Sequence, residues 1–134
     1  MNRRRYLREM TARHDGVLSR NEQRAISRIV VCCAGLGGSG GWTAEALARL
    51  GVRRFRLADP DVFSAVNVNH QAGSDIQTMG RNKAAVLAER ISRIHPGADV
   101  AVFPGGVTKD NVTRFVAGAT AVVDGIDLFE AQVK

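Results

Sequence analysis

The sequence predicts an α/β protein with a Rossmann-like, mostly parallel sheet, helices on both faces and an N-terminal helical arm. Short apolar runs rich in β-branched residues alternate with stretches of helical periodicity. A glycine-rich turn at residues 35–41 directly follows the first such run and opens a helix. Parallel strands joined in this way need right-handed crossovers, which place helices on both faces of the sheet.

The expected elements follow from periodicity and from turn residues. They are helices at 3–13 and 20–27, a strand at 27–34, a helix at 42–50, a strand at 53–58, a helix at 79–94, a strand at 99–104, a helix at 109–116 and a strand at 119–123. Thr108 is the expected cap of the helix at 109–116. In the helix at 42–50, Ala46, Leu47 and Leu50 are expected to share the buried face.

Size and charge divide the chain into two parts. With 134 residues, 45% of them apolar, it is long enough for one domain with a core. Residues 1–28 hold eight of the 19 basic residues and three of the 13 acidic ones, so the rest is nearly neutral. We therefore predict a basic arm at 1–28 and, because the glycine-rich turn lies in the remainder, a nucleotide-binding domain at 29–134.

The basic arm could bind nucleic acid, a neighbouring subunit or a polyphosphate. Aromatic residues make up only 5% of the chain, which argues against nucleic acid. No apolar run is long enough for a membrane span, and no hydrophobic segment follows the basic N-terminus as in a secretory signal. The adjacent Cys32 and Cys33 suit two buried thiols and a reducing, cytoplasmic setting.

The glycine turn matches the spacing of a nucleotide-binding motif, with glycines at positions 35, 37, 38 and 40. Such glycines allow positive φ and let phosphates approach amides at a helix N-terminus. The motif does not distinguish NAD from ATP, and a purely structural turn is the alternative. Asp59 ends the second strand, where a carboxylate accepts hydrogen bonds from ribose. Asp61 fits nucleotide binding or a solvated turn equally well.

Polar residues beyond the second strand favour a triphosphate. Asn67, Asn69, His70 and Gln71 lie within five positions, and Lys83 follows on the next helix. Glycine-loop amides, side-chain amides and a lysine would together supply donors to a triphosphate, although a solvated lysine is the simpler reading of Lys83. Asp124 and Asp127, after the fourth strand, suit a Mg²⁺ ion or a capped turn.

Several motifs together carry a family resemblance. The chain resembles the adenylyltransferase domain of the ThiF/MoeB/HesA family, which ubiquitin-activating enzymes share with bacterial enzymes of molybdopterin and thiamine biosynthesis. The matching segments occur in family order. They are Arg5-Tyr-Leu-Arg8, Gly35-Leu-Gly-Gly-Ser-Gly40, Leu50-Gly-Val52, Asp59-Pro-Asp-Val62 with Asn67 and Gln71, Gly80-Arg-Asn-Lys83, Ile94-His-Pro96 and Val122-Val-Asp-Gly-Ile-Asp127.

The resemblance implies a role for each matching residue. Asp59 would bind the ribose of ATP, Asn67 and Lys83 its phosphates, and Asp127 the Mg²⁺ ion. Arg8 matches the arginine that, in bacterial homodimers, reaches into the partner subunit's site. The family reaction joins a C-terminal carboxylate to AMP and releases pyrophosphate, so the implied partners are a second copy and a ubiquitin-like or sulfur-carrier protein. A short peptide or a modified RNA base are other possible acyl substrates.

Two departures from the family leave other functions open. His70 stands where the family commonly has arginine, so a permanent charge is replaced by a group that is mostly neutral near pH 7. The family domain is also considerably longer, so the chain resembles its N-terminal half, without the regions that carry the crossover loop and the cysteine of sulfur chemistry. A nicotinamide-dependent oxidoreductase domain and a nucleotide-binding pseudoenzyme or scaffold are the alternatives.

Overall fold

The computed structural model describes residues 1–127 as a parallel four-stranded sheet with strand order β3-β2-β1-β4. The elements are α1 (Arg3–Glu9), the 3₁₀ helix η1 (Ala12–His14), α2 (Arg20–Ile26), β1 (Val30–Ala34), α3 (Gly38–Leu50), β2 (Arg54–Ala58), the 3₁₀ helix η2 (Ala65–Asn67), α4 (Lys83–Ile94), β3 (Asp99–Phe103), α5 (Val112–Val116) and β4 (Ala121–Asp124). The predicted α/β fold with a parallel sheet is confirmed. Residues 128–134 of the predicted nucleotide-binding domain lie outside the described residues.

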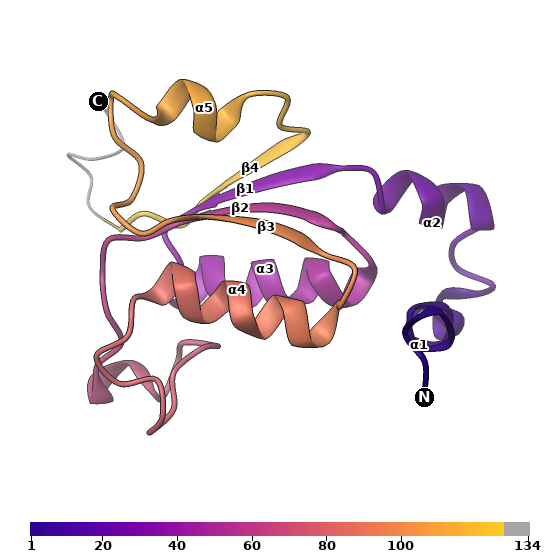
Figure 1. Ribbon diagram of the computed structural model, residues 1–134, viewed down its shortest axis with the longest axis horizontal. Coiled ribbons are helices and arrows are strands. Elements are labelled where there is room, and N and C mark those ends of the chain that lie inside the picture. The colour runs from indigo at the N-terminus through magenta and orange to yellow at the C-terminus, as the bar shows by residue number, and fades with distance from the viewer. Residues whose placement is uncertain (128–134) are drawn as a thin grey trace.

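Helices cover both faces of the sheet, as predicted. The helices α3 and α4 pack on one face and α5 lies on the other (Figure 1). The larger core lies between the sheet and α3 and α4, and Phe55, Leu87 and Ile91 are among its buried side chains. A smaller core beneath α5 contains Phe103 and Phe115, whose rings meet edge to face at 5.2 Å.

The central strand β1 explains why both cysteines are buried. It lies between β2 and β4 in the sheet, and the helices on the two faces cover its side chains on both sides. Cys33 belongs to the larger core and Cys32 to the smaller one, where its thiol donates to the carbonyl oxygen of Phe115 at 3.0 Å. Burial raises the pKa of Cys33 to about 12 and also raises that of Cys32. Both are therefore protonated, unreactive thiols.

Two helices begin later than the sequence predicts, and in the first of them a side-chain cap sets the start. The helix predicted at 79–94 begins at Lys83, since the Asn82 side chain accepts from the amide of Ala85 at 3.1 Å. The helix predicted at 109–116 begins at Val112. Thr108 does not cap it. Instead, Asn111 accepts from the amide of Thr108 at 2.8 Å and thereby orders the preceding loop.

The buried face of α3 also differs from the prediction. The helix begins at Gly38, and Ala44, Glu45 and Ala48 are buried while Ala46 is exposed. Glu45 is tolerated there because Arg49, at 2.7 Å, and Arg90 of α4 form ion pairs with it. Burial raises the pKa of Glu45, but these hydrogen bonds outweigh that effect and hold the pKa below its usual value.

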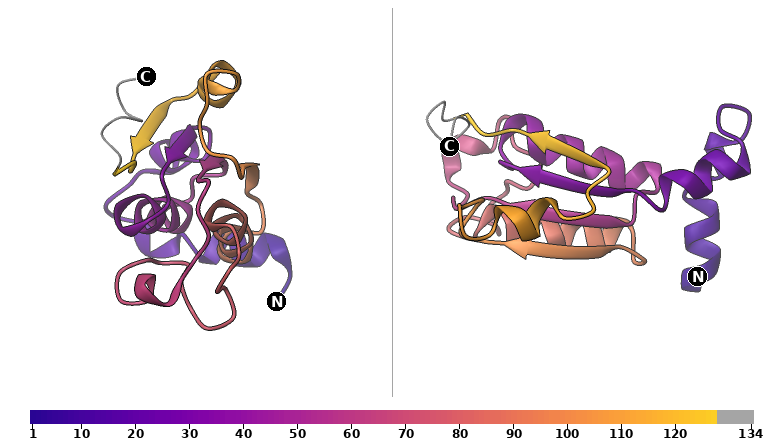
Figure 2. Two further views of the ribbon diagram at one scale, coloured as in Figure 1. Left: turned by 90° about the vertical axis from the view of Figure 1, so that its left-hand side faces the viewer. Right: turned by 90° about the horizontal axis from the view of Figure 1, so that it is seen from above.

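The N-terminal arm is docked on the end of the sheet opposite the carboxyl ends of the strands. Figure 2 (right) shows α1 and α2 beyond that end. The hydroxyl of Tyr6 donates to the carbonyl oxygen of Ile94 at 2.8 Å. The side-chain nitrogen of Gln23 donates to the carbonyl oxygen of Leu50, also at 2.8 Å. These bonds tie the arm to the C-termini of α4 and α3. Among residues 1–127, no helix combines the length and apolar character needed to cross a bilayer.

His95, beneath the arm, makes stability depend on pH. Burial lowers its pKa, and the charges of Arg53 and Arg3 lower it further. The folded protein therefore holds a neutral imidazole, whose Nδ1 atom accepts from the amide of Gly97 at 3.1 Å. Below about pH 6.5 the unfolded chain binds the extra proton more readily, so stability should fall as the pH falls.

We expect the free energy of unfolding in urea to decrease between pH 7.5 and pH 5, by about 1.4 kcal/mol for each unit by which folding lowers the His95 pKa. In His95→Asn this decrease should be smaller, because the variant no longer has the imidazole. His70→Asn is the matched control, since His70 is exposed. An equal pH dependence in wild type and His95→Asn would contradict the assignment.

Candidate nucleotide site at the carboxyl edge of the sheet

The strand order reverses at β1, which is where open α/β sheets form their ligand-binding crevice. From β1 the chain proceeds to β2 and β3 in one direction, with α3 and α4 on one face. It then returns to β4 on the other side of β1, with α5 on the opposite face. Open α/β sheets bind ligands where the strand order reverses in this way, outside the carboxyl ends of the strands. Here that point lies between the ends of β1 and β4.

Three glycines form the floor of this crevice by packing backbone against backbone. Gly35 has a φ of +80°, and a Cβ atom on it would lie 2.5 Å from the carbonyl carbon of Gly125, just after β4. A Cβ atom on Gly40 would overlap the carbonyl oxygen of Gly35. The ends of β1 and β4 and the first turn of α3 can therefore meet this closely only where side chains are absent.

Gly37 and Gly38 have a different environment from Gly35 and Gly40. Cβ atoms on them would lie 3.4 Å from Gln71 Nε2 and His70 Cδ2 respectively, which is ordinary contact. Gly37 occupies the N-cap position of α3, where no side chain accepts from the first amides of the helix. These amides remain available to an anion at the N-terminus of a 13-residue helix.

Asp59 ties the glycine turn to the end of β2. Its carboxylate is almost fully buried, and its two oxygens accept from the amides of Leu36 at 2.7 Å and Asp61 at 2.8 Å. A carboxylate has about four acceptor positions, so both oxygens can still accept from ribose hydroxyls. The predicted ribose residue therefore lies beside the glycine turn, with acceptor capacity left.

Lys83 is buried at the first position of α4. Its side chain is 9% exposed, and its ammonium group lies 3.4 Å from a carboxylate oxygen of Asp61, which is 67% exposed. A cation at a helix N-terminus faces the positive end of the helix dipole. Burying an ammonium group costs desolvation energy, which hydrogen bonds and ion pairs must offset. The single ion pair that Lys83 forms among the described residues is long and exposed to solvent, so it offsets little of that cost. An anionic ligand beside Lys83 would supply the missing stabilisation.

Asn82 is a positioning residue that the sequence analysis did not single out. Its side-chain nitrogen donates to the carbonyl oxygens of Asp59 at 2.9 Å, Asp61 at 3.2 Å and Pro104 at 3.2 Å. It therefore joins the start of α4 to the ends of β2 and β3 and holds Lys83 at the crevice. An asparagine just before a helical pattern is a capping signal, which could have identified it.

Asn67 already has a structural role. Its side-chain oxygen accepts from the amide of Ser64 at 2.9 Å and from the Ser64 hydroxyl at 3.1 Å, which closes η2. Within residues 1–127 its side-chain nitrogen has no hydrogen-bond partner. This nitrogen is the atom that a phosphate contact would use, and the predicted contact stays a prediction.

His70 and Gln71 lie over the glycine turn. His70 Nδ1 bonds to the side-chain oxygen of Asn69, and its Nε2 lies 3.3 Å from Gln71 Nε2. The Gln71 side-chain oxygen is buried and has no partner among the described residues. Trp42 donates from its ring nitrogen to the carbonyl oxygen of His70 at 3.0 Å. The Gln71 side-chain oxygen beside the glycine turn can therefore still accept a hydrogen bond.

The predicted magnesium residues lie at the end of β4 and just beyond it. Asp124 accepts from the amide of Ile126 at 3.1 Å, as in the capped turn considered above. Asp127 is exposed and is the last described residue. Across residues 1–127, no group of three or more His, Cys, Asp or Glu side chains lies close enough to hold a metal. A single carboxylate fits Mg²⁺ that takes its other ligands from phosphates and water.

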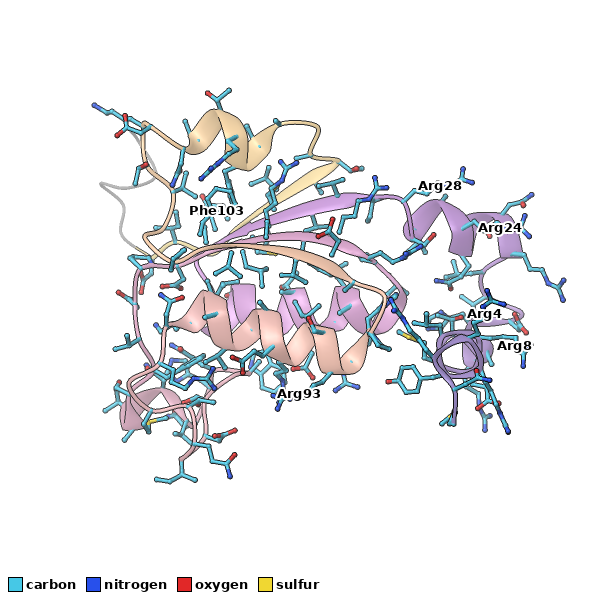
Figure 3. All side chains as sticks on the ribbon, viewed as in Figure 1. Arg4, Arg8, Arg24, Arg28, Arg93 and Phe103 are labelled. Atoms are coloured by element: carbon cyan, nitrogen blue, oxygen red, sulfur yellow. The ribbon has the colours of Figure 1, made fainter. Side chains whose placement is uncertain are left out.

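Arg8 lies on the far side of the molecule from this crevice. It belongs to α1, at the end of the sheet opposite the carboxyl edge (Figure 3). It is therefore separated from the site of its own chain by the length of the sheet. Its predicted role requires a second copy, as the sequence analysis assumed, and stays a prediction.

The ThiF family model matches residues 8–134. This chain belongs to the ThiF family. It is 42% identical to the tRNA threonylcarbamoyladenosine dehydratase of Escherichia coli K12 over 98 residues, which are 72% of this chain and 37% of the relative. It is 30% identical to the molybdopterin-synthase adenylyltransferase of Salmonella typhimurium over 105 residues, 78% of this chain and 42% of that one.

Solved structures of this ThiF family agree with the fold. The crystal structure of the E. coli tRNA N6-threonylcarbamoyladenosine dehydratase in complex with ATP matches with a TM-score of 0.85 and 34% identity. The match covers 90% of this chain and 50% of that one. The chain thus spans half or less of the length of each of these relatives. The predicted family and Rossmann-like architecture are confirmed.

Proposed function

We propose that the protein binds ATP at the carboxyl edge of its sheet and transfers AMP to a carboxylate, releasing pyrophosphate. The observation that carries this proposal is the placement of buried Lys83 at the same edge as the glycine turn and Asp59. Among the described residues, Lys83 forms an ion pair only with the exposed carboxylate of Asp61. A relative of this family has been crystallised with ATP. Both facts favour ATP over a nicotinamide cofactor.

Each predicted residue has a position that suits its role. The uncapped amides at Gly37 and Gly38 would bind phosphate oxygens together with Lys83 and the side-chain nitrogen of Asn67. Asp59 would accept from ribose, while Asp61 would release Lys83 to the triphosphate. Asp127 would hold Mg²⁺, which neutralises phosphate charge when bound.

The reaction itself needs no general base. A carboxylate oxygen attacks the α-phosphorus, the bond from that phosphorus to the bridging oxygen breaks, and pyrophosphate leaves with the oxygen. Negative charge grows on the oxygens being displaced and on those of the α-phosphate. Lys83 would stabilise that charge, and the His70 ring would add a hydrogen-bonding group beside the α3 N-terminus. The residues therefore act by orienting and neutralising the triphosphate.

The carboxylate is most simply that of a modified RNA nucleoside. Threonylcarbamoyladenosine, in the names of several relatives, carries a free threonine carboxylate, and a dehydratase removes water. Adenylylation turns a carboxylate oxygen into a leaving group. A nucleophile of the same nucleoside that then attacks the acyl carbon and loses its proton would expel AMP, and the net change is the loss of water. The predicted sulfur-carrier or ubiquitin-like protein is the second candidate, favoured by the relatives named as molybdopterin-synthase adenylyltransferases. For either substrate, we keep the cytoplasm as the proposed location.

Ligand protection and isotope exchange test the proposal together. ATP with Mg²⁺ should stabilise the protein by about 2.7 kcal/mol at 100 times its dissociation constant, and NADH and NADPH should not. Labelled pyrophosphate should enter ATP only when a carboxylate is present, which we would supply as RNA containing threonylcarbamoyladenosine or as a sulfur-carrier protein. Protection without exchange on either substrate would favour the scaffold, and protection by NADH the oxidoreductase.

Mixing two inactive variants tests whether Arg8 acts in a proposed homodimer. Arg8→Ala and Lys83→Met should each lack exchange activity. Mixed in equal amounts and allowed to exchange subunits, they should regain about a quarter of wild-type activity, because half of the dimers are then mixed and each mixed dimer has one intact site out of two. Continued inactivity despite demonstrated subunit exchange would show that Arg8 does not act across subunits.

A further inference from the structure

We propose that Trp42 is a positioning residue for the ATP site and that it acts through a hydrogen bond to the segment that carries His70 and Gln71. The inference rests on the proposed function and deepens it, because it identifies what holds these two side chains over the glycine turn. Trp42 is the one tryptophan of the chain and lies in the second turn of α3. Its ring is 52% exposed, so burial in the core is not its main contribution.

The hydrogen bond joins two parts of the chain that lie 28 positions apart. Trp42 Nε1 donates to the carbonyl oxygen of His70 at 3.0 Å. Within residues 1–127, no other hydrogen bond connects α3 to residues 64–74. An indole N–H is a donor only, so this contact uses the whole hydrogen-bonding capacity of the ring.

Packing against α3 does little to fix the position of this segment along the helix. Cβ atoms placed on Gly37 and Gly38 would lie 3.4 Å from the side chains of Gln71 and His70, which is ordinary van der Waals contact. Glycines offer no side chains that could interlock with a facing segment. A hydrogen bond, in contrast, is directional and fixes one position. The Trp42 contact therefore decides where the two side chains lie relative to the start of α3.

Held in this way, the two side chains present one N–H group beside the α3 N-terminus. The Asn69 side-chain oxygen can only accept, so His70 Nδ1 carries the proton of the neutral ring and Nε2 is an acceptor. Gln71 Nε2 lies 3.3 Å from that acceptor and donates one of its two hydrogens to it. The second hydrogen has no acceptor within residues 1–127, and the nitrogen that bears it lies beside Gly37, the N-cap of α3. This N–H group would join the uncapped amides in binding a phosphate oxygen.

The variant Trp42→Phe removes the N–H donor and keeps an aromatic ring. By titration calorimetry, its Kd for ATP with Mg²⁺ should rise at least about threefold, since losing one hydrogen bond of ordinary net strength weakens an equilibrium about two- to tenfold. The KM for the acyl substrate in pyrophosphate exchange should stay at the wild-type value, because the lost contact concerns the phosphates.

Thr43→Val is the matched control for this substitution. The Thr43 hydroxyl donates to the carbonyl oxygen of Ser39 at 2.8 Å, a hydrogen bond that stays within α3. The variant therefore also loses one bond from a side chain to a backbone carbonyl. Its Kd for ATP should equal that of the wild type.

A second background shows whether Trp42 acts through the two side chains. In His70→Ala/Gln71→Met the backbone carbonyl that Trp42 contacts remains, but the groups that it positions are gone. Lys83 and the α3 amides are retained, so ATP binding stays measurable. Adding Trp42→Phe in this background should change the Kd by less than about twofold, because effects of coupled residues do not add. A purely structural role would give the same loss in both backgrounds.

An unchanged Kd in folded Trp42→Phe would overturn the inference, and so would an equal rise in both backgrounds. A change of oligomeric state in sedimentation of Trp42→Phe would also overturn it, because the ring would then contact a second copy. In the wild type, the emission of Trp42 should change as ATP binds and saturate together with thermal protection, whereas constant emission would contradict the inference.

The failure of this inference and that of the proposed function give different results. A wild-type protein that ATP does not protect against unfolding refutes the proposed function, whatever the variants do. ATP protection of the wild type, with Trp42→Phe and Thr43→Val showing the same Kd for ATP, refutes only the role of Trp42.

Discussion

Replacing Lys83 with methionine is expected to lower pyrophosphate exchange at least about 100-fold, the usual effect of removing one group that stabilises transition-state charge. Lys83 is the buried cation of the crevice, and Asp61 is its one ion-pair partner among the described residues. The methionine side chain retains most of the aliphatic stem that packs at the start of α4. The variant should therefore fold and lose exchange activity.

Lysine 109 offers a matched control, because it is exposed on the loop before α5. Lys109→Met removes the same charge from the chain but should exchange pyrophosphate at the wild-type rate. Thermal unfolding of both variants would separate loss of chemistry from loss of fold. Exchange within a few-fold of wild type in a folded Lys83→Met protein would remove Lys83 from the mechanism.

Adding one methyl group at Gly40 is expected to destabilise the protein by about 3 kcal/mol and to abolish protection by ATP. The new Cβ atom would overlap the carbonyl oxygen of Gly35, which is backbone and cannot rotate away. Gly35 in turn is in close contact with Gly125. The first turn of α3 would have to move away from β1, carrying its amides out of the crevice.

Gly105→Ala is the control for this substitution. Gly105 follows β3 at the same edge of the sheet, has no positive φ, and a Cβ atom there would meet nothing within 4 Å. Its melting temperature and ATP protection should match those of the wild type. A Gly40→Ala protein with unchanged stability and ATP binding would mean that the backbone contact between α3 and β1 is not required.

Much of the fold and site was predictable from local pattern. The continuous apolar run at β1 predicts a strand buried on both faces, and the glycine spacing predicts a turn into a helix. When strands and helices alternate, the strands form a parallel sheet and their carboxyl ends meet at one edge. Gly35, Asp59 and Asp124 therefore lie at that edge. The three positions, widely spaced along the chain, meet because a parallel sheet leaves no other arrangement.

The burial of two charged side chains depends on partners distant in sequence, so local pattern could not predict it. Glu45 is not among the residues predicted for the buried face of α3, but Arg90 of α4 makes its burial tolerable. Lys83 is likewise buried because the segment between β2 and α4 folds back over the sheet edge. Phe63 of this segment lies in the core. Asn82 at its end donates to three backbone carbonyl oxygens just beyond β2 and β3.

By itself the sequence determined the order of strands and helices, the glycine turn and the polar residues that follow the strands, since these depend on backbone freedom and on the spacing of apolar side chains. Only the tertiary structure decided which charges are buried, which amides stay uncapped and on which end the arginines of the arm lie. Desolvation and ion pairing depend on neighbours brought together by folding, and no local spacing of residues specifies those neighbours.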